Sequence, residues 1–63
     1  MATYYKGTIQ YDNGVKSHRL VWAEGVIEAT AVLSKGIEQF NKDSVDIGSI
    51  ARQRLLSVVV NNW

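Results

Sequence analysis

Apolar and polar residues alternate along residues 3–23 on either side of one turn signal, Asn13-Gly14. Alternation with a period of two is typical of β-strands that are buried on one side only. Asn-Gly is the dipeptide that best fits a two-residue type I′ turn, because both of its residues tolerate positive φ. The pattern therefore predicts a β-hairpin, and a two-residue turn at Asn13-Gly14 fixes the register of its strands.

In this register the two faces of the hairpin differ in character. One face is mostly apolar and pairs Tyr5 with Trp22, Gly7 with Leu20, Ile9 with His18, and Tyr11 with Lys16. The other face is mostly polar and basic, and pairs Tyr4 with Ala23, Lys6 with Val21, Thr8 with Arg19, and Gln10 with Ser17.

Residues 26–40 show the spacing of an amphipathic helix, with apolar residues three and four positions apart. Gly25 is a tolerable N-cap with Glu28 at the third helical position, and Asn41 is a plausible stop. Gly36 lies inside the expected helix, where it suggests a close approach to the sheet. The residues expected on the buried stripe are Val26, Thr30, Leu33, Ile37 and Phe40.

The last third of the chain allows two interpretations. Val58-Val59-Val60 is β-branched and predicts a strand, which extends back to Ile50 in one reading. In the other, Ser49 caps a short helix over residues 49–56. We favour the strand, with a bulge near Arg54-Leu55, because a hairpin needs a third strand to form a stable sheet.

These elements predict one domain over residues 1–63, with an α+β fold in the order β-β-α-β. A three-stranded, mainly antiparallel sheet carries one helix on one face. The residues expected to meet in the core are Tyr5, Ile9, Leu20 and Trp22 from the hairpin and Val26, Leu33, Ile37 and Phe40 from the helix. This format is similar to that of many small proteins of phages and mobile elements, an analogy that assigns a role to no residue.

The chain has 63 residues, no cysteine and a net charge of +1. A domain of this size buries a thin core, and without disulfides it favours association with a second copy. We therefore expect a homo-oligomer. The first residues lack the pattern of a signal peptide, and no stretch is apolar enough to span a membrane, so we expect a cytoplasmic protein without a membrane partner.

Catalytic and metal-binding signals are weak. His18 is the only histidine, and its neighbours Ser17 and Arg19 point to the other side of the strand, so no nucleophile and base pair forms locally. Residues 41–46 contain three oxygen side chains but break the pattern of a calcium loop. We expect no enzyme, no cofactor and no metal site.

Charge is unevenly distributed, because the expected strands are basic and the expected helix region is acidic. Cations beside an aromatic ring on an open sheet face suit single-stranded nucleic acid, since they neutralise phosphates while the ring stacks on a base. We therefore predict a non-catalytic binding protein with a nucleic-acid site at Tyr4, Lys6, Arg19, Arg52 and Arg54. An ordinary solvated sheet face also explains these residues.

An alternative prediction comes from another class, a protein-interaction module or small inhibitor that acts through an edge strand and exposed aromatic residues. Its residues are Val58, Val59, Val60 and Trp63, together with Tyr4. The three valines invite pairing if their strand lies at an edge, whereas they belong to the core if the strand is central. We favour the core position for the valines.

Overall fold

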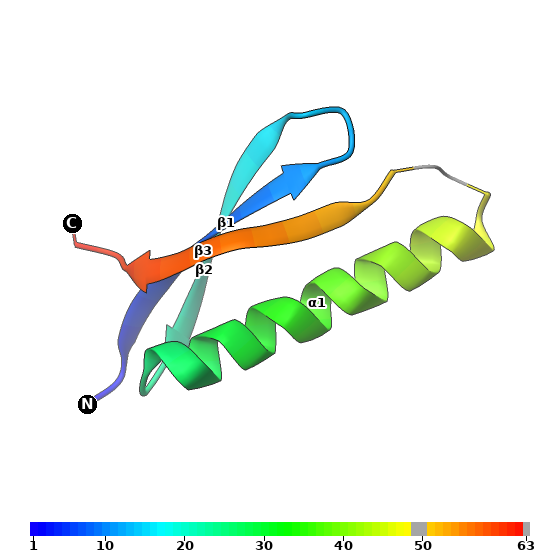
Figure 1. Ribbon diagram of the computed structural model, residues 1–63. Helices are drawn as coiled ribbons and strands as arrows, with labels where there is room; N and C mark the ends of the chain where they lie inside the picture. The colour runs from blue at the N-terminus through cyan, green and yellow to red at the C-terminus, as the bar shows by residue number, and fades with distance from the viewer. Residues whose placement is uncertain (49–50, 63) are drawn as a thin grey trace.

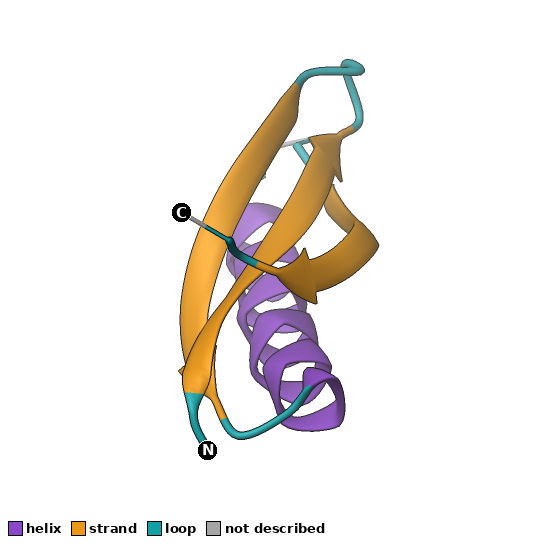
Figure 2. Ribbon diagram, turned by 90° about the vertical axis from the view of Figure 1, so that its left-hand side faces the viewer, coloured by secondary structure: helices purple, strands orange, loops and turns teal. Residues whose placement is uncertain are grey.

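The structure is a computed structural model that describes residues 1–48 and 51–62. Strands β1 (Thr3–Tyr11) and β2 (Lys16–Ala23) are followed by helix α1 (Val26–Asp46) and strand β3 (Gln53–Val60). The strands form an antiparallel sheet in the order β2-β1-β3, and α1 lies across one face of it (Figures 1 and 2). The predicted α+β fold with the order β-β-α-β is confirmed.

The turn between β1 and β2 holds three residues rather than two. The Tyr11 carbonyl accepts a hydrogen bond from the Gly14 N–H, and the Tyr11 N–H donates to the Val15 carbonyl, both at 2.9 Å. Gly14 has a φ of 87°, whereas Asn13 stays at negative φ and its side chain accepts the Val15 N–H at 3.0 Å. This is a type I turn followed by one left-handed residue. The predicted two-residue type I′ turn is wrong because only Gly14 takes the left-handed conformation.

The additional loop residue shifts the hairpin register by one position and exchanges the two faces of β2. Tyr5 pairs with Val21, and Tyr4 pairs with Trp22. Trp22 and Leu20 therefore lie on the face opposite the helix, where they are 61% and 42% exposed. The prediction that they pack beneath the helix is wrong. The residues of β2 that face α1 are Ser17, Arg19, Val21 and Ala23.

The core is small because the sheet presents small residues to the helix. Ala23 and Ala29 are 1% and 0% exposed and pack with Tyr5, with Val21 and Val58 at their side. Small side chains at these positions allow the helix to lie close to the sheet. Ile9 and Ile37 are buried as predicted, whereas Val26 is 48% exposed and does not join the core.

The close approach predicted at Gly36 also occurs at Gly7, where it is tighter. A Cβ atom at Gly7 would lie 2.5 Å from the Leu33 Cδ1 atom, so Leu33 packs directly on the glycine backbone. At Gly36 a Cβ atom would meet a guanidinium nitrogen of Arg19 at 3.0 Å. The centre of the helix therefore rests on β1 at Gly7, and the end of the exposed Arg19 side chain lies beside Gly36.

Helix α1 begins after Gly25, as predicted, and Glu28 accepts the Glu24 N–H at 3.4 Å. It continues to Asp46, so the predicted end at Asn41 is wrong. The Asn41 side chain instead bonds to the backbone of β3: its Oδ1 accepts the Gln53 N–H at 2.8 Å, and its Nδ2 donates to the Gln53 carbonyl at 3.1 Å. Asn41 thus pairs with Gln53 as a neighbouring strand would.

Strand β3 lies at an edge of the sheet, because β1 is central. The predicted bulge falls at Leu56, one residue beyond Arg54-Leu55, since Thr8 pairs with Ser57 and Ile9 with Leu55. The predicted strand is confirmed over Gln53–Val60, so the alternative helix over residues 49–56 is wrong, and residues 51 and 52 precede the strand. The predicted starts at Ser49 and Ile50 lie outside the described residues.

The edge position corrects the expected burial of the three valines. Val58 is partly buried against the core, whereas Val59 and Val60 are 48% and 46% exposed. The preference for core positions is therefore wrong for Val59 and Val60. Trp63, which was predicted to contribute to the interaction surface, lies outside the described residues.

Candidate functional site

The face of the sheet opposite α1, called here the outer face, has no described element packed on it (Figure 2). Its side chains form rows across the strands, because directly paired residues project to the same side. From one end to the other, the rows are Trp22 with Tyr4, then Leu20 with Lys6 and Val59, then His18 with Thr8 and Ser57, and finally Lys16 with Gln10 and Arg54.

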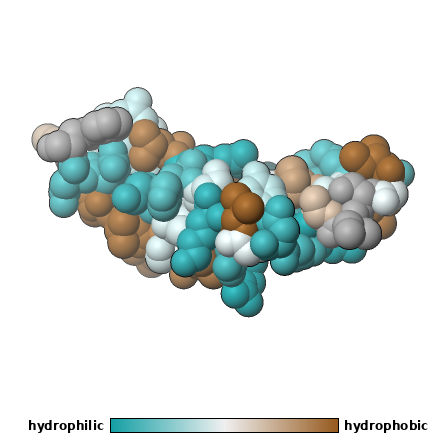
Figure 3. Space-filling model, turned by 90° about the horizontal axis from the view of Figure 1, so that it is seen from above, coloured by the Kyte–Doolittle hydropathy of each residue, from teal (hydrophilic) through white to brown (hydrophobic). Residues whose placement is uncertain are grey.

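Aromatic side chains occupy one end of the outer face. The rings of Tyr4 and Trp22 meet edge to face, with centroids 4.9 Å apart and an angle of 72° between their planes. Tyr4 is 44% exposed and Trp22 61% exposed, so both rings offer surface to solvent. Seen from above, hydrophilic side chains separate several apolar patches on the molecule (Figure 3).

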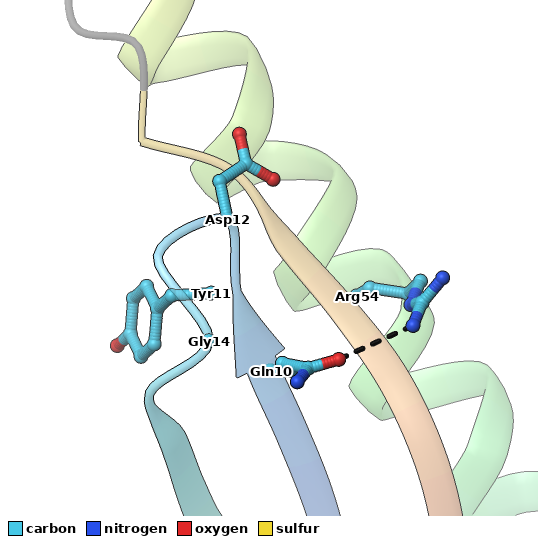
Figure 4. A pocket seen from close by; sticks show the side chains of 5 residues that line it. All are labelled: Gln10, Tyr11, Asp12, Gly14 and Arg54. Carbon is cyan, nitrogen blue, oxygen red and sulfur yellow. Dashed lines mark hydrogen bonds between the residues drawn. The ribbon is translucent and has the colours of Figure 1, made fainter.

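Cations occupy the middle and the other end of the outer face. Lys6 lies one row from the ring pair, between Leu20 and Val59. Lys16 and Arg54 flank Gln10, and the Arg54 guanidinium donates to the Gln10 Oε1 atom at 3.2 Å (Figure 4). The acceptor of this bond is neutral, so the positive charge of Arg54 stays available to an anion.

His18 adds a polar group to the same face. Its Nδ1 atom lies 3.3 Å from the Thr8 hydroxyl, which pairs with it across the strands. The donor in this bond depends on the tautomer of the imidazole ring.

The charge of the sheet has one sign. Strands β1, β2 and β3 contain Lys6, Lys16, Arg19 and Arg54 but no aspartate or glutamate. Four of the six carboxylates lie on α1, with two lysines. The one ion pair found among residues 1–48 and 51–62 joins the Met1 amino group to Glu24 at 3.4 Å. The molecule thus presents a basic sheet and an acidic helix, which favours an anionic ligand at the sheet.

The structure brings together only part of the predicted site. Tyr4, Lys6 and Arg54 share the outer face, as predicted. Arg19 does not, because the shifted register turns it toward Gly36 of the helix. Arg52 precedes β3, and its guanidinium lies 3.5 Å from the Asn41 carbonyl on the helix. The prediction that Arg19 and Arg52 lie with Tyr4, Lys6 and Arg54 is therefore wrong, because neither side chain lies on the outer face.

Sequence reasoning missed Trp22, His18 and Lys16, which the outer face contains in place of Arg19. The signal that would have found them is the turn. A three-residue loop over residues 12–14 places all three beside Tyr4, Thr8 and Gln10.

A polar hollow of about 280 Å³ lies at the tip of the hairpin, lined by Gln10, Tyr11, Asp12, Gly14 and Arg54 (Figure 4). Asp12 and Arg54 bring opposite charges to it, so the hollow does not select an anion. It contains neither histidine nor a nucleophile beside a base, which gives it no evident reaction chemistry. Within the part of the chain that the structure describes, no group of three histidine, cysteine or acidic residues is arranged to hold a metal ion.

Comparisons of the chain with protein-family models, with curated proteins and with solved structures gave no match. No helix among the described residues has the length and apolar character needed to cross a membrane.

Proposed function

We propose that this protein is a non-catalytic binding protein that contacts single-stranded nucleic acid through the outer face. The observation that carries the proposal is the combination of an exposed ring pair, Tyr4 and Trp22, with Lys6 in the adjacent row and no carboxylate on any of the three strands. Stacking on a ring stabilises a bound base by about 1–3 kcal/mol, and cations neutralise the phosphates.

The residues for base stacking and for phosphate binding lie at different positions along β1. Tyr4 and Gln10 are six residues apart, which corresponds to roughly 20 Å in an extended strand. A nucleic-acid strand laid along β1 therefore reaches from the rings at one end to Lys16 and Arg54 at the other. Bases would stack at Tyr4 and Trp22, and phosphates would contact Lys6 and the two terminal cations.

An open sheet with exposed rings suits a single strand better than a duplex. Bases in a duplex are stacked on each other and unavailable to side-chain rings, whereas unpaired bases are free to stack. Readout in the major groove uses a projecting helix or ribbon, and α1 carries net negative charge.

The test is a titration of fluorescent single-stranded DNA and RNA at low and moderate salt. A variant with Lys6→Gln and Arg54→Gln removes two cations from the outer face, and a matched variant with Lys35→Gln and Lys42→Gln removes two exposed cations from the helix. Log affinity falls linearly with log salt concentration, and we expect the first variant to make this fall less steep by about 1.4. The helix variant is expected to keep the slope of the wild type.

Two results would remove the proposal. One is no binding of either single strand at low salt, and the other is an equal loss of affinity in the two variants. Trp22→Ala separates stacking from charge, because it should weaken binding at both salt concentrations and leave the slope unchanged.

A protein-interaction module is the second candidate, and the apolar part of the same surface supports it. Leu20, Trp22 and Val59 are each at least 40% exposed on the outer face. Binding through such residues is insensitive to salt, whereas phosphate contacts weaken steeply as salt rises. Capture of a protein partner that survives moderate salt would therefore favour this candidate.

A further inference from the structure

The free edge of β3 presents backbone groups that no described strand pairs. The Asn61 N–H donates to the Tyr4 carbonyl at 3.0 Å, so the backbone of Asn61 is directed toward β1. The direction of the backbone N–H and C=O groups alternates along a strand, so those of Val59 are directed toward β1 as well. The N–H and C=O groups of Val58 and Val60 point away from β1, to the side where β3 has no neighbouring strand.

The beginning of this edge is already covered. Asn41 of the helix bonds to both backbone groups of Gln53, as described above. Farther along β3, the exposed large apolar side chains begin at Leu56, with Val59 and Val60 following. The uncovered part of the edge is thus the valine end.

The two edges of the sheet differ in charge. Edge strands commonly avoid association by carrying charged side chains. Strand β2 follows this rule with Lys16 and Arg19, whereas residues 55–60 of β3 carry no charge. Self-pairing of β2 would bring like charges together, and self-pairing of β3 would not.

We propose that a second copy of this chain pairs with β3 in an antiparallel arrangement about a two-fold axis. Val59 faces Val59 of the second copy, and Val58 faces Val60 in both directions. In this register the outward N–H and C=O groups of Val58 and Val60 exchange hydrogen bonds across the axis.

Self-complementarity favours a second copy over an unrelated peptide. Val58-Val59-Val60 reads the same in both directions, so two antiparallel copies place valine against valine at the three central positions of the pairing. The Asn61 Nδ2 atom is buried without a hydrogen-bond partner among the described residues. The same register places the Ser57 hydroxyl of the second copy opposite Asn61, where it would accept a hydrogen bond after a rotation of the amide.

The pairing would join two sheets into one with both outer faces on the same side, because the two-fold axis runs perpendicular to the sheet. The outer faces of the two copies would then form one surface, with a Lys6 side chain on either side of the two central Val59 side chains. The dimer itself does not depend on nucleic acid, and its test needs none.

The first experiment measures the mass of the full chain in solution over a range of concentrations. The paired stretch is short, so we expect a dimer of twice 7.0 kDa that dissociates on dilution. Val59→Lys places two like charges opposite each other and should raise the dissociation constant at least about tenfold. Val32→Lys is the matched control, because Val32 is 50% exposed on the helix and Val59 is 48% exposed, and it should dimerise like the wild type.

A wild-type mass of 7.0 kDa at every concentration up to about 1 mM would overturn the proposal. Equal dimerisation of Val59→Lys and the wild type would overturn it as well.

Amide hydrogen exchange of the wild type tests the same register and does not require a variant to fold. The amides of Val58 and Val60 should be protected at high concentration and exchange quickly on dilution. The Val59 amide should be protected at both concentrations because it is directed toward β1. Exchange at Val58 and Val60 that is fast at high concentration, or independent of concentration, would contradict the pairing.

Discussion

Replacing Gly7 by alanine tests the contact that sets the distance between helix and sheet. The new Cβ would lie 2.5 Å from the Leu33 Cδ1 atom, 3.2 Å from Cδ2 and 3.3 Å from Cγ. Because Cγ and both Cδ atoms are close, rotation of the Leu33 side chain about its last bond does not relieve the overlap. Leu33 is 1% exposed, so the surrounding core also restricts its movement.

The magnitude follows from two opposing terms. Overpacking of a core costs about 1–3 kcal/mol, and replacing a glycine inside a strand by alanine returns about 0.5–1 kcal/mol. Gly7 is not in the left-handed region, so backbone strain does not add to the cost. We expect Gly7→Ala to lower the free energy of unfolding by about 1–2 kcal/mol, which corresponds to a fall in Tm of about 5–15 °C for a domain of this size.

Thermal and urea unfolding of four proteins measure this effect: the wild type, Gly7→Ala, Leu33→Val and the double variant. Leu33→Val removes both Cδ atoms, so Gly7→Ala should cost much less in that background. Gly36→Ala provides the same chemical change at a site where the neighbour is the mobile end of Arg19 at 3.0 Å. It should raise stability by up to about 1 kcal/mol, because glycine is unfavourable inside a helix.

Equal stability of Gly7→Ala and the wild type would contradict the tight packing of Leu33 on Gly7. An equal loss of stability with leucine and with valine at position 33 would contradict it as well.

Further predictions concern the turn, the Asn41 bridge and the exposed tryptophan. Gly14→Val should lower stability by about 1–3 kcal/mol in thermal unfolding, because φ is 87°, and Gly14→Asn should lower it less. Asn41→Ala leaves the Gln53 N–H and C=O without their partner and should cost about 1–3 kcal/mol in urea unfolding, whereas Asn41→Asp, which retains the acceptor, should cost less. Trp22→Ala should change the unfolding free energy by less than about 1 kcal/mol, because the side chain is 61% exposed; a larger loss would place Trp22 in the core after all.

The elements of the fold were predictable from the sequence, but the register of the hairpin was not. Leu33 and Ile37 lie on the buried stripe because their helical spacing is unambiguous. The Asn13-Gly14 signal, in contrast, fits both a two-residue and a three-residue loop, since Gly14 takes positive φ in either. One residue of difference then moves every side chain of β2 to the other face.

The hydrophobic pattern of β2 did not correct this error. Burying Trp22 and Leu20 looked favourable because large apolar residues gain most from burial. The observed packing instead places Ala23 against Ala29, and small residues at that position let the helix approach Tyr5. A single sequence does not show how close two elements lie, so it does not show whether a large or a small residue fits between them. The helix end was missed for a related reason, because Asn41 bonds to Gln53, which is distant along the chain.

The central place of β1 in the sheet has a consequence for how the chain folds. The hairpin and the helix rest on local contacts, but the sheet is complete only when β3 pairs with β1, as in the bond from Asn61 to Tyr4. Pairing of β3 with β1 brings Asn61 to Tyr4, so it closes a loop that contains nearly the whole chain. The entropic cost of closing this loop arises before the new contacts stabilise the sheet. We expect this docking step to limit the folding rate, with hairpin and helix forming first. Until β3 arrives, one side of β1 remains an open edge, and this is the state in which the chain is most exposed to aggregation.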